Sequence, residues 1–393
     1  MAAAMKPKLA LVGPWDRLIW TGRKALISEM IQRGWEVVAI GSVTPGQDYV
    51  ARIESLGARF IPVQVARFID PITDAKYLVR LVKILRRERC DLVHTFTIKP
   101  NLFGTVAARI ARVPKIVSLV EGFGYGYREG SHPTARCLRG LFFAALKVAF
   151  LLSHKVWFLN RDDLRECESL QLLTPGKGVM IASCGVDTNS LKSDRVDPEA
   201  IQALRRELGG TDKTQFVICV GRMNWPKGVR EYVEASRLVA KQCQNSLFVL
   251  VGEIQPGSPF SVPREYLLNS NNANFRWLDF RHDVKELMAL ADVVVLPTYY
   301  REGVPLVLLE GLSLGKPIVA TDWVGCREAV IDGVNGFLVP IKDEASLAGA
   351  ISRLLRDSSL RMRMGNEGRQ MAEKQFDEKD IARRVVAQVY GVA

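Results

Sequence analysis

The stretch ADVVVLPTYYREGVPLVLLEGLSLG, residues 291–315, decides the fold. It begins with an apolar run, residues 293–296, that is short enough for a strand buried on both faces. A second apolar run follows Pro305, a residue that is favoured in the first turn of a helix. The stretch therefore predicts a buried strand, a polar loop and a helix, which together form one unit of a parallel α/β sheet.

The same alternation of strand and helix patterns extends from this stretch in both directions. It starts near the N-terminus, is interrupted by a polar segment at 187–214, and then starts again. We therefore expect two Rossmann-like doubly wound domains that face each other across a cleft, covering residues 1–190 and 191–375, with a final helix at 376–393 that packs back across both. The predicted strands are residues 8–13, 36–41, 59–63, 91–94, 115–120, 156–159, 216–220, 248–251, 275–278, 293–296 and 318–320.

Composition excludes several classes of protein. Of 393 residues, 48% are apolar and 24% are charged, which is typical of a soluble globular protein and not of a disordered or fibrous one. The seven cysteines form no C-x-x-C pair and the four histidines lie far apart, so we expect neither a disulfide framework nor a metal site. The start does not resemble a secretory signal, which favours a cytoplasmic protein.

The longest apolar stretch, residues 138–159, is interrupted by Arg139, Lys147, His154 and Lys155. A helix that spans a bilayer needs about 20 uninterrupted apolar residues. We interpret the stretch as a largely buried helix followed by a strand, with insertion into a membrane surface as the alternative.

The positive charge is concentrated in the first half of the chain. Residues 1–190 contain 27 Lys and Arg against 16 Asp and Glu, so they carry +11 of the net +12. A basic face attracts anionic lipid, a phosphorylated substrate or nucleic acid. No motif of a nucleic-acid-binding domain accompanies the charge, so we expect no nucleic-acid partner.

Two carboxylates and a helix start suggest a site for a diphosphate ligand. Glu302 precedes the helix expected from Pro305, and Glu310 lies within it. Backbone N–H groups of Val304, Leu306 and their neighbours would face an anion at the positive end of the helix dipole. The alternative is that Glu302 only complements this dipole and Glu310 is an exposed helix acid.

The stretch VGRMNWPKG, residues 220–228, follows another predicted strand. Arg222 and Lys227 would bind the diphosphate and stabilise charge on a leaving group. A strand-end turn with a solvated lysine is the alternative.

The chain resembles glycosyltransferase family 4, a family of retaining enzymes with the GT-B fold. The matching stretches are VGRMNWPKG, residues 291–322, GCREAVIDGVNGFLVP, VHTFTIKPNLFGTVAARIARVPK and GFGYGY. Within the family the chain is most similar to bacterial capsular-polysaccharide and lipid-linked-oligosaccharide enzymes, including N-acetylgalactosaminyltransferases of protein glycosylation.

This resemblance assigns roles to residues of the second domain, which would bind the nucleotide-sugar donor. Arg222 and Lys227 would hold the donor diphosphate, and Glu302 the hydroxyls of the donor sugar. Gly303, Val304, Pro305 and Leu306 would offer backbone amides, Glu310 would bind the ribose, and Arg281 lies in the region that lines the base. Asp279 stands where relatives commonly have Gly.

The first domain would bind the acceptor. Thr21 and Gly22 correspond to a flexible loop near both substrates. Many relatives carry a His where this chain has Glu121, which here would contact an acceptor hydroxyl, with a charged loop residue as the alternative. His94 would shape the acceptor pocket or be a buried structural histidine at a strand end.

The resemblance implies transfer of a hexosyl unit from a UDP-sugar, with retention and without a metal ion or other cofactor. The expected unit is N-acetylhexosaminyl, and the expected acceptor a polyprenyl-diphosphate-linked sugar at the cytoplasmic face of the membrane. The basic stretch KYLVRLVKILRRER, residues 76–89, would bind the anionic surface, or would be an ordinary crossover helix. Alternatives are a soluble acceptor, a nucleotide-sugar epimerase of the same fold, and a non-catalytic nucleotide-sugar-binding protein.

Overall fold

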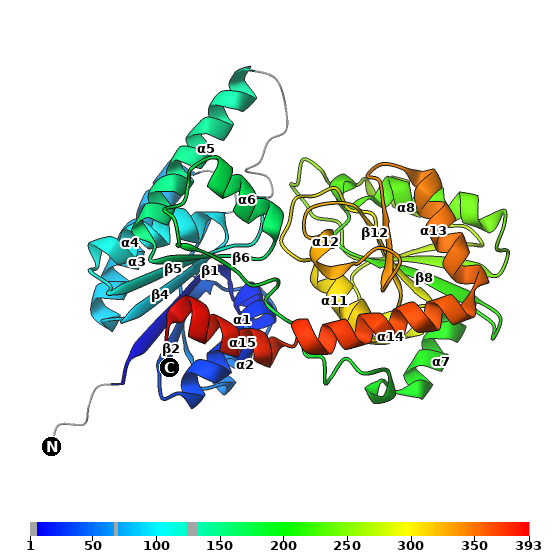
Figure 1. Cartoon of the computed structure of the whole chain (residues 1–393), viewed down its shortest axis with the longest axis horizontal. Helices are drawn as coiled ribbons and strands as arrows, with labels where there is room; N and C mark the ends of the chain where they lie inside the picture. The colour runs from blue at the N-terminus through cyan, green and yellow to red at the C-terminus, as the bar shows by residue number, and fades with distance from the viewer. Residues whose placement is uncertain (1–5, 67–69, 124–132, 393) are drawn as a thin grey trace. The chain divides into compact units, whose positions relative to one another are not determined.

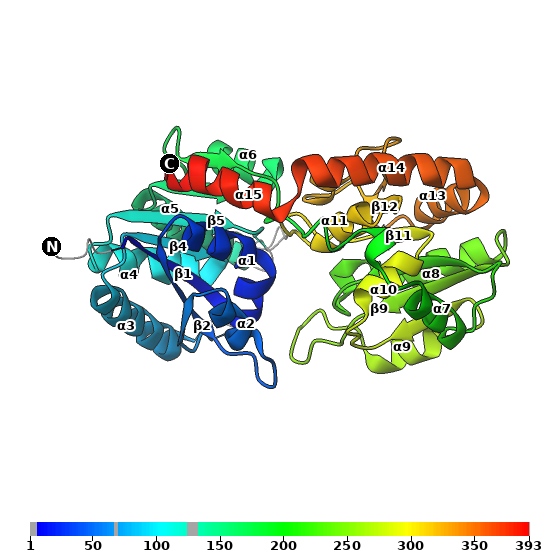
Figure 2. The ribbon, with the colours of Figure 1, turned by 90° about the horizontal axis from the view of Figure 1, so that it is seen from below.

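The computed structural model describes residues 6–66, 70–123 and 133–392 of the chain. The chain forms two compact units (Figures 1 and 2). The first unit comprises Met1–Gly185 together with Glu378–Ala393, and the second comprises Val186–Asp377. The chain therefore passes between the units twice, and its C-terminal segment belongs to the first unit.

The first unit contains a parallel sheet of seven strands in the order β3-β2-β1-β4-β5-β6-β7. The sequence predicts six of these strands and misses the short β7. The strands are β1 (Lys8–Trp15), β2 (Glu36–Ser42), β3 (Arg59–Pro62), β4 (Leu92–Phe96), β5 (Lys115–Val120), β6 (Lys155–Phe158) and β7 (Gly178–Met180).

Helices cover the sheet of the first unit, and apolar residues fill the space between them and the strands. The core that includes α1 is completed by residues of the C-terminal segment, such as Ile381 and Tyr390. The helical elements are α1 (Asp16–Gln32), α2 (Tyr49–Ser55), α3 (Pro71–Glu88), the π-helical turn η1 (Pro100–Gly104), α4 (Thr105–Ile110), α5 (Pro133–Leu152), α6 (Arg161–Ser169), α15 (Glu378–Val385) and the π-helical turn η5 (Val386–Tyr390).

The second unit contains six parallel strands in the order β10-β9-β8-β11-β12-β13. The central residues of β8, β9, β11 and β12 are apolar and buried, as a sheet with helices on both faces requires, whereas the edge strands β10 and β13 are partly half-buried. The strands are β8 (Gln215–Val220), β9 (Ser246–Val251), β10 (Phe275–Leu278), β11 (Val293–Leu296), β12 (Ile318–Thr321) and β13 (Gly336–Val339).

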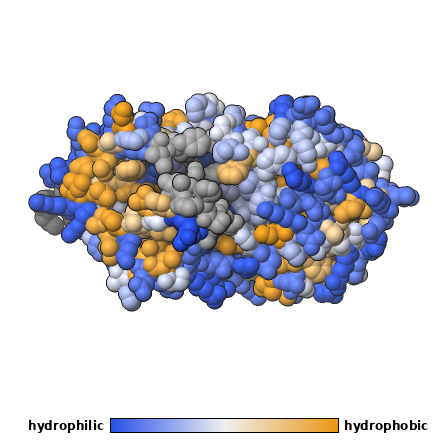
Figure 3. All heavy atoms as spheres, turned by 90° about the horizontal axis from the view of Figure 1, so that it is seen from above, coloured by the Kyte–Doolittle hydropathy of each residue, from blue (hydrophilic) through white to orange (hydrophobic). Residues whose placement is uncertain are grey.

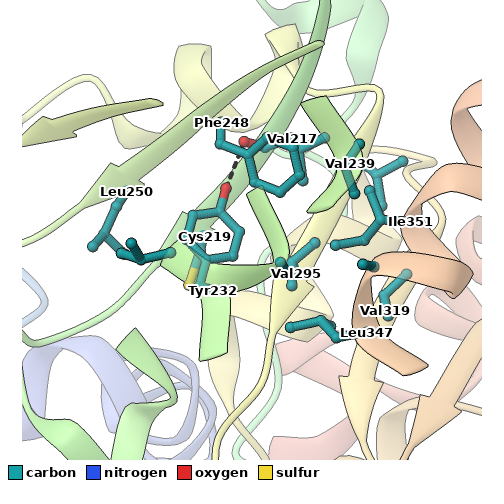
Figure 4. Close-up of a cluster of buried hydrophobic side chains, with 14 of the residues drawn as sticks. Val217, Cys219, Tyr232, Val239, Phe248, Leu250, Val295, Val319, Leu347 and Ile351 are labelled. Atoms are coloured by element: carbon teal, nitrogen blue, oxygen red, sulfur yellow. Dashed lines mark hydrogen bonds between the residues drawn. The ribbon is translucent and has the colours of Figure 1, made fainter. Parts of the chain in front are cut away.

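A buried tyrosine anchors one helix of the second unit to its sheet. The hydroxyl of Tyr232, in α8, donates a hydrogen bond to the carbonyl oxygen of Val217 in β8 at 2.6 Å (Figure 4). The helical elements of this unit are η3 (Ser193–Arg195), α7 (Pro198–Glu207), the 3₁₀ turn η4 (Trp225–Lys227), α8 (Val229–Ala240), α9 (Arg264–Ser270), α10 (Val284–Leu290), α11 (Leu306–Ser313), α12 (Cys326–Ala329), α13 (Glu344–Arg356) and α14 (Ser358–Gln375).

Both sheets change winding direction at a central pair of strands, β1 and β4 in the first unit and β8 and β11 in the second. In doubly wound sheets, ligands bind beyond the carboxyl ends of the strands at this switch point. The loops that follow these strands are therefore where a site is expected.

Candidate active site

Two charged residues meet at the switch point of the second unit. Lys227 lies in η4 after β8, and Glu302 lies in the loop after β11. The Nζ atom of Lys227 is 2.5 Å from Oε1 and 2.8 Å from Oε2 of Glu302. Their side chains are 12% and 20% exposed, so the ion pair is partly shielded from water and still accessible. The structure thus joins the two motifs that the sequence singled out.

A close approach of backbones holds the two loops together. Gly228 has a φ of +80°, and a Cβ atom at this position would come within 2.0 Å of the carbonyl oxygen of Pro297 at the end of β11. The Pro226 carbonyl accepts hydrogen bonds from the backbone N–H of Tyr299, at 2.8 Å, and from the buried hydroxyl of Thr298, at 3.1 Å. Glycine is required at 228 for both conformation and space.

Arg222 lies in the same loop as Lys227. Its Nη1 atom is 3.5 Å from Oε1 of Gln255, and its guanidinium lies 5.9 Å from the ring centre of Tyr300. The same ring is 5.8 Å from Nζ of Lys227. Two cations therefore flank one aromatic ring near the carboxylate of Glu302. Gln255 is not predicted from the sequence, because it lies in an irregular loop after β9.

The backbone of residues 303–306 leads into α11 beside this pair. Gly303, Val304 and Pro305 are buried, and the helix begins at Leu306 with Pro305 as its N-cap residue, one position later than predicted. The first N–H groups of a helix have no partner within it, so they are available to an anion. Glu310 is half-buried within α11.

Arg281 follows β10, as expected, but its guanidinium is engaged by two carboxylates. Nη1 and Nη2 lie 2.8 and 3.2 Å from the oxygens of Glu207, and Nε and Nη2 lie 2.8 and 2.6 Å from those of Asp283. These hydrogen bonds raise the pKa of Arg281 above its ordinary value. Asp279 pairs with Arg264 at 3.1 Å. The role of Arg281 toward a base stays a prediction.

Glu121 directly follows β5 and forms an ion pair that the sequence did not reveal. Its Oε1 atom lies 2.7 Å from Nη2 of Arg23, a residue of α1 that is only 2% exposed. The guanidinium of Arg23 also lies 4.1 Å from the ring centre of Phe96 and donates to Sγ of Cys184 at 3.2 Å. Burial acts to lower the pKa of Arg23, but Cys184 and Glu121 outweigh it and raise the pKa. The arginine is therefore a fixed cation behind Glu121.

His94 is buried in the middle of β4 and does not stand at a strand end. Its Nδ1 atom is 2.5 Å from the hydroxyl of Tyr390, and the centres of the His94 and Trp157 rings are 5.9 Å apart. Burial, together with the charge of Arg23, holds the pKa of His94 well below its ordinary value, so the imidazole is neutral. This placement agrees with a buried structural histidine.

Two further expectations need correction. Thr21 and Gly22 do not form a turn, because α1 begins at Asp16, immediately after β1, and contains both residues. Helix α3 does not expose the apolar face expected for it, because Tyr77, Leu81 and Leu85 are at most 1% exposed and pack in the core of the first unit. Its outer face is largely basic, although Val79 is 53% exposed, and contact of α3 with an anionic surface stays a prediction.

Neither a metal-binding cluster nor a membrane-spanning helix is found among the described residues. Within residues 6–66, 70–123 and 133–392, no three His, Cys, Asp or Glu side chains are grouped so that they could hold a metal ion. In the same part of the chain, no helix has both the length and the apolar content needed to cross a bilayer.

Comparison with known proteins places the chain in a family. The model of Glycosyl transferases group 1 matches residues 200–371, and that of the Glycosyl transferase 4-like domain matches residues 19–154. An N,N'-diacetylbacillosaminyl-diphospho-undecaprenol alpha-1,3-N-acetylgalactosaminyltransferase of Campylobacter jejuni is 30% identical over 367 residues, covering 93% of this chain and 94% of that protein. The chain is a family 4 glycosyltransferase.

Other relatives agree with this assignment. A UDP-Gal:alpha-D-GlcNAc-diphosphoundecaprenol alpha-1,3-galactosyltransferase of Escherichia coli is 29% identical over 330 residues, covering 82% of this chain and 80% of that protein. A crystal structure of HepE from Anabaena in complex with UDP and glucose superposes with a TM-score of 0.77 at 19% identity, covering 98% of this chain and all of that one. The predicted GT-B fold of two Rossmann-like domains is therefore confirmed, and the family 4 glycosyltransferase is a hexosyltransferase.

Proposed function

We propose that this glycosyltransferase transfers a hexosyl unit, specifically N-acetylhexosaminyl, from a UDP-sugar to a polyprenyl-diphosphate-linked sugar at the cytoplasmic face of the membrane. The observation that carries the proposal is the ion pair between Lys227 and Glu302 at the switch point of the second unit. Arg222 and the N-terminus of α11 lie in the adjoining loops, so cations, backbone N–H groups and a carboxylate are available to one ligand.

Each group of this site suits one part of a nucleotide sugar. The cations Arg222 and Lys227 would neutralise the diphosphate and stabilise the charge that develops as it leaves. The N–H groups at the start of α11 would bind phosphate oxygens, and Glu302 would accept hydrogen bonds from sugar hydroxyls. Glu310 would hold the ribose. In the absence of donor, Lys227 keeps the Glu302 carboxylate in place, so the site is organised before the donor arrives.

The proposed reaction retains the configuration at the anomeric carbon. The bond between this carbon and the diphosphate oxygen breaks, and the acceptor oxygen forms its bond on the same face of the sugar. The proton of the acceptor hydroxyl passes to an oxygen of the departing diphosphate. Positive charge from Arg222 and Lys227 would serve where other enzymes use a divalent ion, so we propose that turnover needs no metal.

The choice of donor and acceptor draws on the relatives. The names of the Campylobacter jejuni and Escherichia coli enzymes describe diphospho-undecaprenol-linked sugars as their acceptors, and the Anabaena protein binds UDP. The first unit supplies Glu121, backed by Arg23, as a group that would accept a hydrogen bond from the acceptor hydroxyl.

A transfer assay tests the proposal. Radiolabelled UDP-N-acetylglucosamine, UDP-N-acetylgalactosamine, UDP-glucose and UDP-galactose are each incubated with short-chain polyprenyl-diphosphate sugars, with soluble sugars and without acceptor. We expect label in the lipid product from a UDP-N-acetylhexosamine, and an unchanged anomeric configuration by NMR. Transfer only to soluble sugars would contradict the proposed acceptor, and conversion of the donor without acceptor would indicate an epimerase.

A further inference from the structure

The loop after β9 supports the backbone of the loop that carries Arg222. The N–H of Met223 donates to the Glu253 carbonyl at 3.0 Å, and the Met223 carbonyl accepts a hydrogen bond from the N–H of Val262 at 2.9 Å. Both backbone groups of the residue next to Arg222 are therefore held by one loop. We call residues 253–262 the supporting loop.

A close approach of two backbones brings the supporting loop to this position. Gly252, directly before the loop, has a φ of +144°, and a Cβ atom there would come within 1.9 Å of the carbonyl oxygen of Gly221. Any other residue type at 252 would push the two segments apart. The start of the supporting loop is thus fixed beside the backbone that leads into Arg222.

One side chain of the supporting loop reaches the cation. Oε1 of Gln255 accepts a hydrogen bond from Nη1 of Arg222 at 3.5 Å and another from Nδ2 of Asn224 at 3.1 Å. Both neighbours are donors, so the carbonyl end of the Gln255 amide, and not its NH₂ end, faces Arg222. Asn224 is only 4% exposed, so it gives Gln255 a fixed second contact. The longer bond guides the guanidinium without holding it tightly.

The charge of Arg222 is not compensated by the protein. Among the residues that the structure describes, no carboxylate forms an ion pair with its guanidinium. Two other cations of the second unit differ, because Lys227 pairs with Glu302 and Arg281 is held by two carboxylates. A glutamine at 255 supplies a hydrogen-bond acceptor without a negative charge. A glutamate there would neutralise the guanidinium and repel a diphosphate.

We infer that Gln255 is a positioning residue for Arg222: its neutral amide aims the guanidinium at the donor diphosphate and leaves the positive charge available to this ligand. The inference rests on the proposed function, in which Arg222 binds the donor diphosphate. It extends that function to a residue of another loop, which contacts the donor only through Arg222. The affinity for UDP should therefore depend on whether residue 255 is neutral or negative.

Calorimetric titration of the whole enzyme with UDP tests the inference. Gln255→Glu should weaken UDP binding about tenfold or more, because the new carboxylate pairs with Arg222 and repels the diphosphate. Gln255→Met keeps the size and neutrality of the side chain but removes the acceptor oxygen. It should weaken UDP binding at most about threefold and lower kcat about fivefold, because the charge remains but is no longer aimed. Equal UDP affinity of Gln255→Glu and the wild type would overturn the inference.

A double-mutant cycle separates a role through Arg222 from a purely structural one. Arg222→Gln removes the charge that Gln255 is inferred to direct. When Gln255→Met is added to this variant, kcat should change by less than about twofold. A further loss of about fivefold in the double variant would show that Gln255 acts independently of Arg222 and would overturn the inference. This cycle decides the question even if Gln255→Glu does not fold.

Gln242 offers a matched control in the same unit. Its Oε1 atom accepts a hydrogen bond from Nη2 of Arg356 at 2.8 Å, and both residues are exposed. Much of the surface of the second unit is hydrophilic, as the right-hand side of Figure 3 shows, so an added carboxylate on it should be tolerated. Gln242→Glu and Gln242→Met should keep wild-type UDP affinity and kcat. Losses equal to those at 255 would overturn the inference.

The titration also separates this inference from the proposed function. A wild-type enzyme that does not bind UDP would refute the proposed donor, and the inference with it. A wild-type enzyme that binds UDP, together with a folded Gln255→Glu variant that binds it equally well, would refute only the role of Gln255. Transfer to soluble sugars alone would refute the proposed acceptor and would leave the UDP titrations unaffected.

Discussion

The carboxylate of Glu121 lies 2.7 Å from the guanidinium of Arg23, which is buried in the first unit. The pair links the end of β5 to the middle of α1, so that the half-buried carboxylate of Glu121 lies at the carboxyl edge of the sheet, where acceptors are expected to bind. Arg23 is therefore a positioning residue in the proposed mechanism.

The substitution Glu121→Gln should affect both the stability of the enzyme and its kinetics with the acceptor. The buried guanidinium loses its counter-charge, which should lower the free energy of unfolding by about 2 kcal/mol. The KM for acceptor should rise and kcat/KM should fall about tenfold or more, while UDP affinity stays unchanged. Denaturation curves, acceptor kinetics and UDP calorimetry measure the three effects. The control Glu29→Gln breaks the surface ion pair with Arg33 in the same helix and should change neither stability nor kinetics appreciably.

Lys227→Met and Glu302→Gln should each lower kcat by about 10²–10³-fold with little change in thermal stability. Because the two side chains bind each other, the double variant should be no worse than the more damaged single variant. Steady-state kinetics of the four proteins test this coupling. Lys285→Met, which removes a half-buried cation of the same unit that donates to the Arg195 carbonyl, serves as control. Independent, multiplicative losses would show that the two groups do not act as one site.

Gly228→Ala should disrupt the donor site through the backbone next to Lys227. The new methyl group would meet the Pro297 carbonyl, so the two loops must separate. We expect the free energy of unfolding to fall by about 1–3 kcal/mol and UDP to bind markedly more weakly. Gly209→Ala is the matched control: its φ of +77° is similar, but nothing lies within 4 Å of the added carbon. If the control loses as much UDP affinity as Gly228→Ala, backbone strain alone would explain the result.

Buried, neutral His94 should make the first unit sensitive to acid. Its pKa is lowered in the folded state, so the unfolded state takes up the proton first as the pH falls. His94 makes its full contribution to the free energy of unfolding above the unfolded pKa of about 6.5. This contribution declines at lower pH, with a slope of up to about 1.4 kcal/mol per pH unit. The protection factors of the β4 amides in hydrogen exchange, which correct for the pH dependence of the intrinsic rate, should fall as the pH is lowered from about 7 to about 5. His94→Gln should weaken this dependence, and β8 of the second unit provides an internal reference.

Removal of divalent ions should leave turnover unchanged. Purified enzyme treated with EDTA and assayed in buffers without metal should keep its full rate, because Arg222 and Lys227 are proposed to supply the positive charge. A rate that falls with EDTA and returns with magnesium or manganese would contradict this part of the mechanism.

The sequence was most informative where burial constrains it. Strands β5, β10 and β11 have the predicted bounds. For β5 and β11 the reason is that a strand with helices on both faces is a largely apolar run. The strands β7 and β13 were missed, since each begins with a glycine, a residue that is depleted in strands, and β7 is only three residues long. The start of α1 was placed too late because no turn separates it from β1.

The candidate site was predictable only in part. The loops after β8 and β11 carry charged residues at recognisable spacing, and the structure brings Lys227 and Glu302 together. Arg23 was not predicted, because a cation on an amphipathic helix normally faces water. Only the tertiary fold brings Arg23 beside Glu121 and Phe96. Similarly, the basic stretch of α3 indicated membrane contact, but packing buries its apolar face.

The division of the chain has a consequence for its synthesis. The second unit is a continuous segment, Val186–Asp377, whereas the core of the first unit includes Ile381, Val385 and Tyr390. A ribosome makes these residues only after the whole of the second unit. The first unit therefore cannot complete its core, and His94 lacks the hydroxyl of Tyr390, at a stage when the second unit can already fold. Nascent chains of this enzyme should accordingly depend on chaperones until residues 381–390 have left the ribosome.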